Sequence, residues 1–290
     1  MKLAIIGILV DLVLAAIKLL AGWFGNSYAL IADGFESTLD IAGSFVIWAG
    51  LKVAALPADE THPYGHGKAE PVSAIIVSLV VFGAAVALTV ESVGEILAPH
   101  HRAAPKPFTL VVLVLVIIIK ETLYRIVKRA GDQAQSTALQ TDAGHHRSDA
   151  ITSVAAMIGI SIALIGGKGY EAADNYAAVF ACAVIAYNGI KLFIPALYEI
   201  LDTAPPRGVI ETIRKSAASI EGVQEIEKCK VRKMGVEFYA DLHVVVSGDI
   251  SVRDGHNIAH RVKNAIRKGN PAISDVLVHV EPVGEPFQEE

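Results

Sequence analysis

Residues 71–90 read PVSAIIVSLVVFGAAVALTV, a run of twenty residues without one charged side chain. A helix needs about 20 mostly apolar residues to cross the hydrocarbon core of a bilayer. The sequence contains six stretches of this kind, separated by turn or charge signals: about 3–24, 29–52, 71–97, 107–124, 138–165 and 173–198. We therefore predict an α-helical membrane protein with six transmembrane helices.

The charged side chains are concentrated at the other end of the chain. The whole sequence is 53% apolar and 19% charged, yet 25 of its 55 charged residues lie in residues 205–290. This distribution excludes a disordered chain, a disulfide-rich mini-protein and an ordinary soluble globule. The net charge of −5 offers no basic surface for nucleic acid. We expect two domains, a transport domain in residues 1–204 and a soluble domain in residues 205–290, joined at the helix-breaking Pro205-Pro206.

The soluble tail has an alternating pattern of helices and strands. We predict helices over 208–220 and 252–268, the second capped by Ser251. Strands are predicted over 225–233, 236–246 and 275–281, because apolar residues recur there at every second position. The order α-β-β-α-β implies a small α+β domain in which one layer of helices covers a sheet.

Lysine and arginine are more frequent on one side of the predicted spans. If the N-terminus is in the cytoplasm, seven basic residues flank the spans on the inner side: Lys2, Lys52, Lys68, Arg125, Lys128, Arg129 and Arg207. The outer loops then contain only three: Arg102, Lys106 and Lys168. Positive residues favour the cytoplasmic side. Both termini are therefore expected in the cytoplasm, with the chain in the cell (inner) membrane.

Two of the spans carry matching polar motifs. Residues 32–40 read ADGFESTLD and residues 141–149 read TDAGHHRSD. Residues four apart lie on the same face of a helix, so Glu36 lies one turn from Asp40, and His145 one turn from Asp149. Charged groups in a span are costly and are functional candidates. Asp33 and Asp142 are interpreted as supporting or helix-capping groups, and His146 lies on a different face from His145.

Three carboxylates and one imidazole on facing helices would form a divalent-metal site. Without a cation, the carboxylates would repel one another and some would protonate. Four N/O ligands suit tetrahedral Zn²⁺, and Fe²⁺, Co²⁺, Cd²⁺ or Mn²⁺ also fit. The alternative is that these residues are polar groups that pack helices together. For any one of these residues alone, we favour a role in helix packing. For the four together, we favour the metal site.

Two further clusters contain metal-compatible side chains. Asp59, His62 and His66 lie within eight residues of a Pro- and Gly-rich loop. In the tail, such residues are spread over the predicted strands and the second helix: His243, His256, His279 and Glu281. Solvated loops and surface histidines often bind nothing, so both clusters are open to that simpler interpretation.

The motifs resemble those of the cation diffusion facilitator family. The resemblance rests on residues 29–40, on HPYGHGKAE at 62–70, on residues 142–149 and on the tail sequences DLH at 241–243 and VHVEP at 278–282. It covers nearly the whole chain. It implies six transmembrane helices, a ferredoxin-like cytoplasmic domain and a homodimer that exports a divalent cation in exchange for protons.

The resemblance also implies roles for individual residues. The transport site would consist of Glu36, Asp40, His145 and Asp149, the loop site of Asp59, His62 and His66, and the tail site of His243, His256, His279 and Glu281. Lys68 and Asp202 would form a charge interlock that holds the two protomers together near the membrane surface. Glu36 stands where zinc-transporting members commonly have His or Asp, and Glu227 stands where some members have His.

We expect zinc efflux by alternating access, with Fe²⁺ or Mn²⁺ efflux by the same fold as the alternative. Two less favoured functions belong to other classes. An intramembrane metalloenzyme would need a further general base, and the sequence has no His-Glu-x-x-His motif. A metal sensor that uses the spans only as an anchor would not need four metal-compatible groups inside them.

Overall fold

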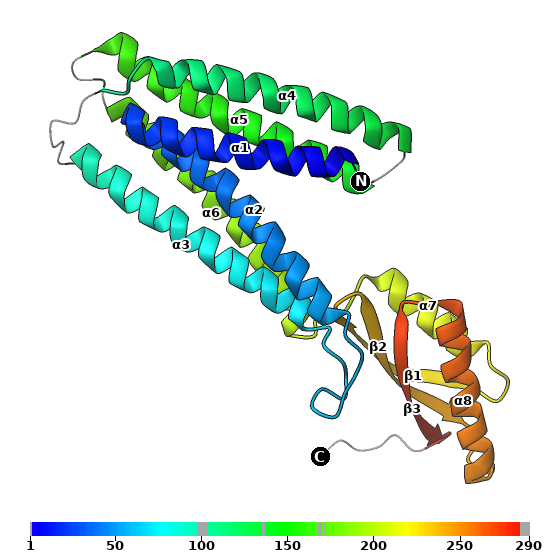
Figure 1. Ribbon diagram of the computed structural model, residues 1–290. Coiled ribbons are helices and arrows are strands. Elements are labelled where there is room, and N and C mark those ends of the chain that lie inside the picture. Colours follow the sequence, from blue (N-terminus) through cyan, green and yellow to red (C-terminus); the bar gives the residue numbers. More distant parts are fainter. Residues whose placement is uncertain (1, 98–103, 135–136, 168–169, 171, 285–290) are drawn as a thin grey trace. The chain divides into compact units, whose positions relative to one another are not determined.

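The computed structural model describes residues 2–97, 104–134, 137–167, 170 and 172–284, without the side chains of 2–6, 131, 134, 137–142 and 145. Its contacts divide the chain into two compact parts, residues 1–46 with 76–193, and residues 47–75 with 194–290. The first part contains most of the length of the long helices, and the second contains the loop at residues 55–68, the helix ends that flank it and the tail (Figure 1).

Six long helices correspond to the six predicted spans. They are α1 (Lys2–Gly25), α2 (Tyr28–Ala54), α3 (Ala69–Leu97), α4 (Phe108–Ala134), α5 (Thr137–Gly166) and α6 (Ala172–Ile200). Among the described residues, five of these helices are long and apolar enough to cross a membrane. In α4, the apolar run is interrupted by Lys120, Glu121 and Arg125.

The fourth helix extends beyond the predicted span of about 107–124. The helix continues through the charged segment as far as Ala134. Arginine, lysine and glutamine are good helix formers, and this segment contains no proline. The single Gly131 costs only about 1 kcal/mol relative to alanine, which is too little to end a helix.

Small residues allow the helices of the first part to approach closely. A Cβ on Gly159 of α5 would lie 2.3 Å from the Cβ of Ala177 in α6. Buried alanines on both helices, Ala156 and Ala178 among them, belong to the same core cluster. Helices in membranes commonly pack through such small residues. The close contact fixes α5, which carries the second polar motif, against α6.

The start of α2 is held by a residue from α6. The Asp174 carboxylate accepts hydrogen bonds from the Ser27 hydroxyl (2.7 Å) and from the Tyr28 backbone N–H (2.6 Å). The first N–H groups of a helix have no partner within it, so an outside carboxylate stabilises this end. The contact holds the start of α2, the helix that carries the first of the two polar motifs, against α6.

The tail is a three-stranded sheet covered on one face by two helices. Its elements are α7 (Arg207–Ala218), β1 (Glu225–Met234), β2 (Glu237–Val246), α8 (Val252–Gly269) and β3 (Ile273–Pro282). The strand order is β1-β2-β3, with β1 antiparallel and β3 parallel to β2. Figure 1 shows this α+β fold, and the predicted fold class is confirmed.

The core of the tail follows the predicted alternation. Ala240, Leu242, Val244 and Val246 of β2 are buried against residues of α7 and α8. Ser251 caps α8, since its hydroxyl accepts a hydrogen bond from the Asp254 backbone N–H at 3.2 Å. The opposite face of β2 remains available for polar side chains, which include His243.

Candidate metal centre

The acidic residues of α2 and α5 lie in the interior of the first part. Glu36 and Asp149 are 6% and 4% exposed, and Asp40 is half-buried. Asp33, Asp40 and Asp149 all lie close enough to Glu36 to interact with it electrostatically. One carboxylate oxygen of Glu36, Oε2, is buried without a hydrogen-bond partner among the described residues. Carboxylates from two helices therefore share one region.

The fourth predicted ligand, His145, lies on α5, and its side chain is outside the described residues. Its neighbour His146 is buried on another face of the helix, where its Nδ1 lies 3.8 Å from Asp11 Oδ2 of α1. Within the part of the chain that the structure describes, the α2 and α5 acids do not form a group whose ligand atoms all approach within 4.8 Å.

Asp33 has partners on two other helices. Its carboxylate lies 3.0 Å from Lys18 Nζ of α1 and accepts a hydrogen bond from the Ser153 hydroxyl of α5 at 2.8 Å. Lys18 also donates to the Ser37 hydroxyl at 3.1 Å. Buried charges are tolerated when they are paired in this way. Asp33 therefore links α1, α2 and α5 around the candidate ligands.

Lys120 was not identified from the sequence as a residue near the candidate ligands. This α4 residue is 1% exposed, and its Nζ lies 2.6 Å from Asp149 Oδ2 and 2.7 Å from Asp11 Oδ1. The sequence does contain a pattern that indicates a buried lysine, because Lys120 directly follows the apolar run at residues 110–119. A lysine in such a run needs a carboxylate from another helix.

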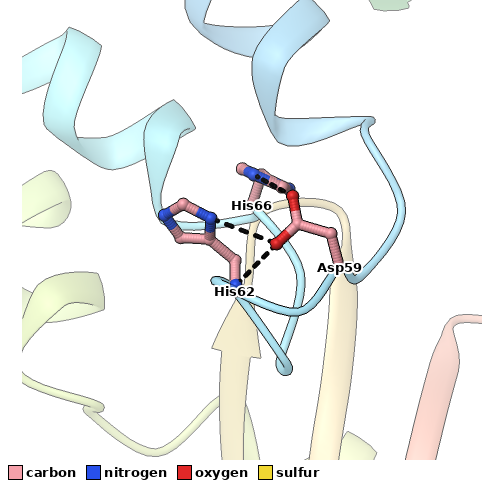
Figure 2. Close-up of side chains that lie close together, drawn as sticks. All are labelled: Asp59, His62 and His66. Carbon is pink, nitrogen blue, oxygen red and sulfur yellow. Dashed lines mark hydrogen bonds and ion pairs between the residues drawn. The ribbon is translucent and has the colours of Figure 1, made fainter.

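The loop after α2 brings together its three predicted ligands. Asp59 Oδ1 lies 3.4 Å from His62 Nδ1, and Asp59 Oδ2 lies 3.5 Å from His66 Nε2. Figure 2 shows both imidazoles directed toward the carboxylate. Two ligands of a tetrahedral zinc ion are about 3.3 Å apart, given bonds of about 2.0–2.1 Å. The donor set and its spacing therefore suit Zn²⁺.

Local hydrogen bonds hold this loop in shape. The backbone N–H groups of His62 (2.6 Å) and Thr61 (2.9 Å) donate to Asp59 Oδ1, as does the Thr61 hydroxyl. These bonds, chiefly the one from the His62 N–H, lower the pKa of Asp59 to about 2. A lowered pKa keeps the carboxylate charged at every pH above that value, so Asp59 is an anionic ligand at neutral pH.

The tail cluster is formed by the pairing of β2 with β3. His243 lies opposite His279 in the parallel register, and their ring centroids are 5.0 Å apart. Glu281 contacts both rings, since its Oε1 pairs with His243 Nδ1 and lies 3.6 Å from His279 Nε2. All three ligand atoms approach within 4.8 Å. Two imidazoles and a carboxylate can bind Zn²⁺ or a similar ion.

The other tail residues lie beside this cluster. A hydrogen bond shared with Glu281 raises the pKa of Glu227 and lowers that of Glu281. His256 and His260 of α8 lie edge to face, with ring centroids 4.4 Å apart. It lines a groove together with Glu281 but is not part of the three-residue group. The reason is that α8 holds it while the other ligands lie on neighbouring strands.

Replacement of His243 or His279 by alanine is expected to weaken Zn²⁺ binding by the full-length protein in detergent. Each change removes one of three clustered ligands. Binding is measured by equilibrium dialysis in a His62→Ala, His66→Ala background, which removes the loop ligands. His260→Ala is the matched control, and equal affinities in all variants would contradict a metal site on β2 and β3.

Lys68 and Asp202 pair within one protomer. Lys68 Nζ lies 2.6 Å from Asp202 Oδ1 and also donates to the Glu199 carbonyl. Both side chains are partly exposed, so this pair by itself contributes only about 0–1 kcal/mol. Close by, the Glu199 carboxylate accepts hydrogen bonds from Lys233 Nζ (2.7 Å) and from the Gly235 N–H (3.1 Å). The end of α6 is thereby joined to the β1–β2 hairpin.

Comparison with known proteins gives matches to both portions of the chain. The model of the cation efflux transmembrane domain matches residues 4–201. The model of the cytoplasmic domain of cation efflux proteins, ZT_dimer, matches residues 205–283.

Two relatives, Metal tolerance protein C1 and MneP, agree with these matches. The chain is 32% identical to Metal tolerance protein C1 of Arabidopsis thaliana, over 97% of this chain and 62% of that protein. It is 28% identical to the Manganese efflux system protein MneP of Bacillus subtilis (strain 168), over 98% of this chain and 96% of that protein. A solved nickel form of a MamM CTD is 22% identical, with a TM-score of 0.27, over 27% of this chain and 100% of that one.

These matches settle the class of protein. Cation efflux proteins are multi-pass membrane transporters with a cytoplasmic C-terminal domain, and they are not enzymes. The alternative of an intramembrane metalloenzyme is therefore wrong. The chain belongs to the cation efflux, or cation diffusion facilitator, family of divalent-cation transporters.

Proposed function

We propose that this transporter exports a divalent metal ion from the cytoplasm in exchange for protons, through a site made of Glu36, Asp40, His145 and Asp149. The observation that carries the proposal is the buried carboxylate oxygen of Glu36, which has no hydrogen-bond partner among the described residues and lies in the electrostatic field of Asp40 and Asp149. A buried, unpartnered carboxylate beside other carboxylates is costly. A bound dication or proton offsets that cost.

Proton exchange follows from the chemistry of the ligands. Metal ions bind the deprotonated forms of carboxylates and imidazoles, so protons and metal compete for the same atoms. An ordinary imidazole titrates near pH 6.5, which makes His145 the natural partner for one proton. In the cytoplasm-facing state the deprotonated site takes the metal. In the outward-facing state protons displace it.

The test is transport by purified protein in sealed vesicles. An acidic lumen is expected to drive Zn²⁺ into the vesicles while protons leave, and a protonophore is expected to abolish this uptake. Lumenal Zn²⁺ is followed with a trapped fluorescent indicator, and vesicles without protein are the control. Uptake that ignores the direction of the proton gradient would contradict antiport, and uptake of Mn²⁺ without uptake of Zn²⁺ would contradict zinc as the cargo.

Zinc is the cargo that we place first, because an imidazole and three carboxylates can form a tetrahedral zinc site. Manganese is the second candidate, and two observations favour it. The relative MneP is named as a manganese efflux protein. Glu36 also gives the site a third carboxylate, and oxygen-rich sites suit Mn²⁺. Iron(II) efflux by the same fold remains the third candidate.

A change of Glu36 is expected to change the choice of metal. In Glu36→His, a second imidazole should favour Zn²⁺ over Mn²⁺ by about tenfold, since nitrogen ligands suit zinc. Glu36→Asp retains the oxygen ligand and serves as the matched control. The measurement is the ratio of initial Zn²⁺ and Mn²⁺ fluxes in vesicles that contain equal amounts of protein. An unchanged ratio in Glu36→His would remove Glu36 from the site.

The remaining assignments complete the proposal. Residues 1–204 form the transport domain and residues 205–290 the regulatory and dimerisation domain of a homodimer, both termini being cytoplasmic and the membrane being the cell (inner) membrane. The match to ZT_dimer supports the homodimer. The loop site and the tail site bind cytoplasmic metal, and the tail closes the dimer when metal binds. The pair that Lys68 and Asp202 form within each protomer acts as the charge interlock that supports the dimer beside the membrane.

A further inference from the structure

Lys120 occupies the inward-facing stripe of α4. The buried residues of this helix include Leu113, Val116, Lys120 and Val127, which recur at spacings of three, four and seven residues. Such spacing places them on one face. The ammonium group is therefore held inside the first part of the protein, at the middle of its helix. A charge in this position is expensive, so it needs a strong partner or a function.

Two carboxylates share this one ammonium group. Asp149 Oδ2 of α5 lies 2.6 Å from Lys120 Nζ, and Asp11 Oδ1 of α1 lies 2.7 Å from it. The side chain of Asp149 is 6% exposed and that of Asp11 is 16% exposed. The other oxygen of Asp11, Oδ2, lies 3.8 Å from His146 Nδ1. One positive charge thus faces two negative charges, and the two contacts are nearly equal in length.

The contact with Asp149 conflicts with metal binding at the same carboxylate. A carboxylate oxygen lies about 2.0–2.2 Å from a bound Zn²⁺. An ammonium group that stayed within hydrogen-bond distance of that carboxylate would be repelled by the dication in a medium of low dielectric constant. Lys120 contacts Oδ2, so a metal ion that bound this oxygen would have to displace the ammonium group. Asp11 offers the ammonium a second carboxylate that it already contacts.

We propose that Lys120 is a tethered cation that competes with the cargo for Asp149, and that Asp11 retains Lys120 while metal is bound. This inference rests on the proposed function, because it requires Asp149 to be a ligand of the transported ion. Lys120 is a positioning residue, since it acts on the metal through Asp149. In the metal-free carrier it compensates the charge of Asp149, so that an empty site does not expose an uncompensated carboxylate to the membrane interior.

A purely structural ion pair leads to a different expectation. If Lys120 only held α1, α4 and α5 together, loss of either partner would loosen the protein and weaken metal binding. Competition predicts opposite effects. Lys120→Gln removes the ammonium group from Asp149 and tightens Zn²⁺ binding. Asp11→Asn leaves Asp149 as the charged carboxylate that Lys120 contacts, and it weakens Zn²⁺ binding.

The experiment measures Zn²⁺ affinity of full-length protein in detergent at pH 7.5 by equilibrium dialysis. The background carries His62→Ala, His66→Ala, His243→Ala and His279→Ala, so that the loop and tail clusters do not contribute. The Kd is expected to fall about tenfold in Lys120→Gln and to rise about tenfold in Asp11→Asn, a typical size for coupling between two binding events. If Lys120→Gln does not fold, the double variant Lys120→Gln, Asp11→Asn replaces it and must bind more tightly than Asp11→Asn alone.

The outcomes separate this inference from the function on which it rests. Affinities that move in the same direction in both variants, or that do not change, would overturn the competition while leaving the transport site intact. Undiminished Zn²⁺ binding in Asp149→Ala would overturn the transport site, and the inference with it. Loss of binding in Asp149→Ala together with opposite shifts in the Lys120 and Asp11 variants would support both.

Discussion

Replacement of Asp149 by alanine is expected to abolish proton-driven metal uptake in vesicles, and Asp40→Ala is expected to do the same. Each change removes one charged ligand from a buried site. Removing one member of a buried, charged interaction costs about 3–5 kcal/mol, which corresponds to more than a hundredfold in affinity. Initial Zn²⁺ uptake into vesicles with an acidic lumen, at equal amounts of incorporated protein, measures the effect.

Two controls separate loss of the site from loss of the fold. In Asp149→Ala, Lys120 retains its contact with Asp11, so the buried ammonium is still paired. Asp249→Asn removes a carboxylate from an exposed turn of the tail and is expected to transport normally. Size-exclusion profiles of all variants should match that of the unmodified protein. Normal uptake by Asp40→Ala and Asp149→Ala would end the assignment of the transport site.

Enlargement of Gly159 is expected to disrupt the transport domain. The Cβ of alanine at this position would lie 2.3 Å from Ala177 Cβ and 3.0 Å from the Ala173 carbonyl oxygen, both of α6. Carbon atoms in contact are about 3.5–4.0 Å apart, and neither atom belongs to a flexible side chain that could move away. Gly159→Ala must therefore push α5 and α6 apart, and Gly159→Leu more so.

The expected result is a lower melting temperature in detergent for Gly159→Ala and little folded protein for Gly159→Leu. Overpacking of a tight contact costs about 1–3 kcal/mol, and larger groups cost more. Gly83→Ala is the matched control, because a Cβ on Gly83 of α3 would have no neighbour within 4 Å. Alanine in place of a helical glycine stabilises by up to about 1 kcal/mol. Equal melting temperatures for the Gly159→Ala and Gly83→Ala variants would show that α5 and α6 do not pack through Gly159.

Much of the fold follows from local patterns. The apolar run at residues 71–90 predicts a membrane helix, because a span must satisfy its backbone hydrogen bonds internally. The alternation in residues 236–246 predicts β2 and its buried face, since successive side chains of a strand point to opposite sides. The predicted span does not fix how far α4 extends, because charged residues can continue a helix beyond the membrane.

The candidate sites depend on the sequence to different degrees. The loop cluster is close to a local property, since Asp59, His62 and His66 lie within eight residues and the Asp59 carboxylate organises the turn itself. The tail cluster requires more, because only the parallel register of β2 and β3 brings His243 opposite His279. His256 was expected in the tail site, but it lies on α8 and is not part of the three-residue group.

The sequence by itself determined the six spans, the α+β tail, and the acids and histidines that can bind a cation, because length, periodicity and residue type are local properties of a chain. Only the tertiary structure decided which charges meet. Lys120 pairs with Asp149 and Asp11, and Lys18 pairs with Asp33, although other acids lie as near in sequence. The physical reason is that a buried charge must find its partner across helix contacts, and these contacts depend on the packing of the whole domain.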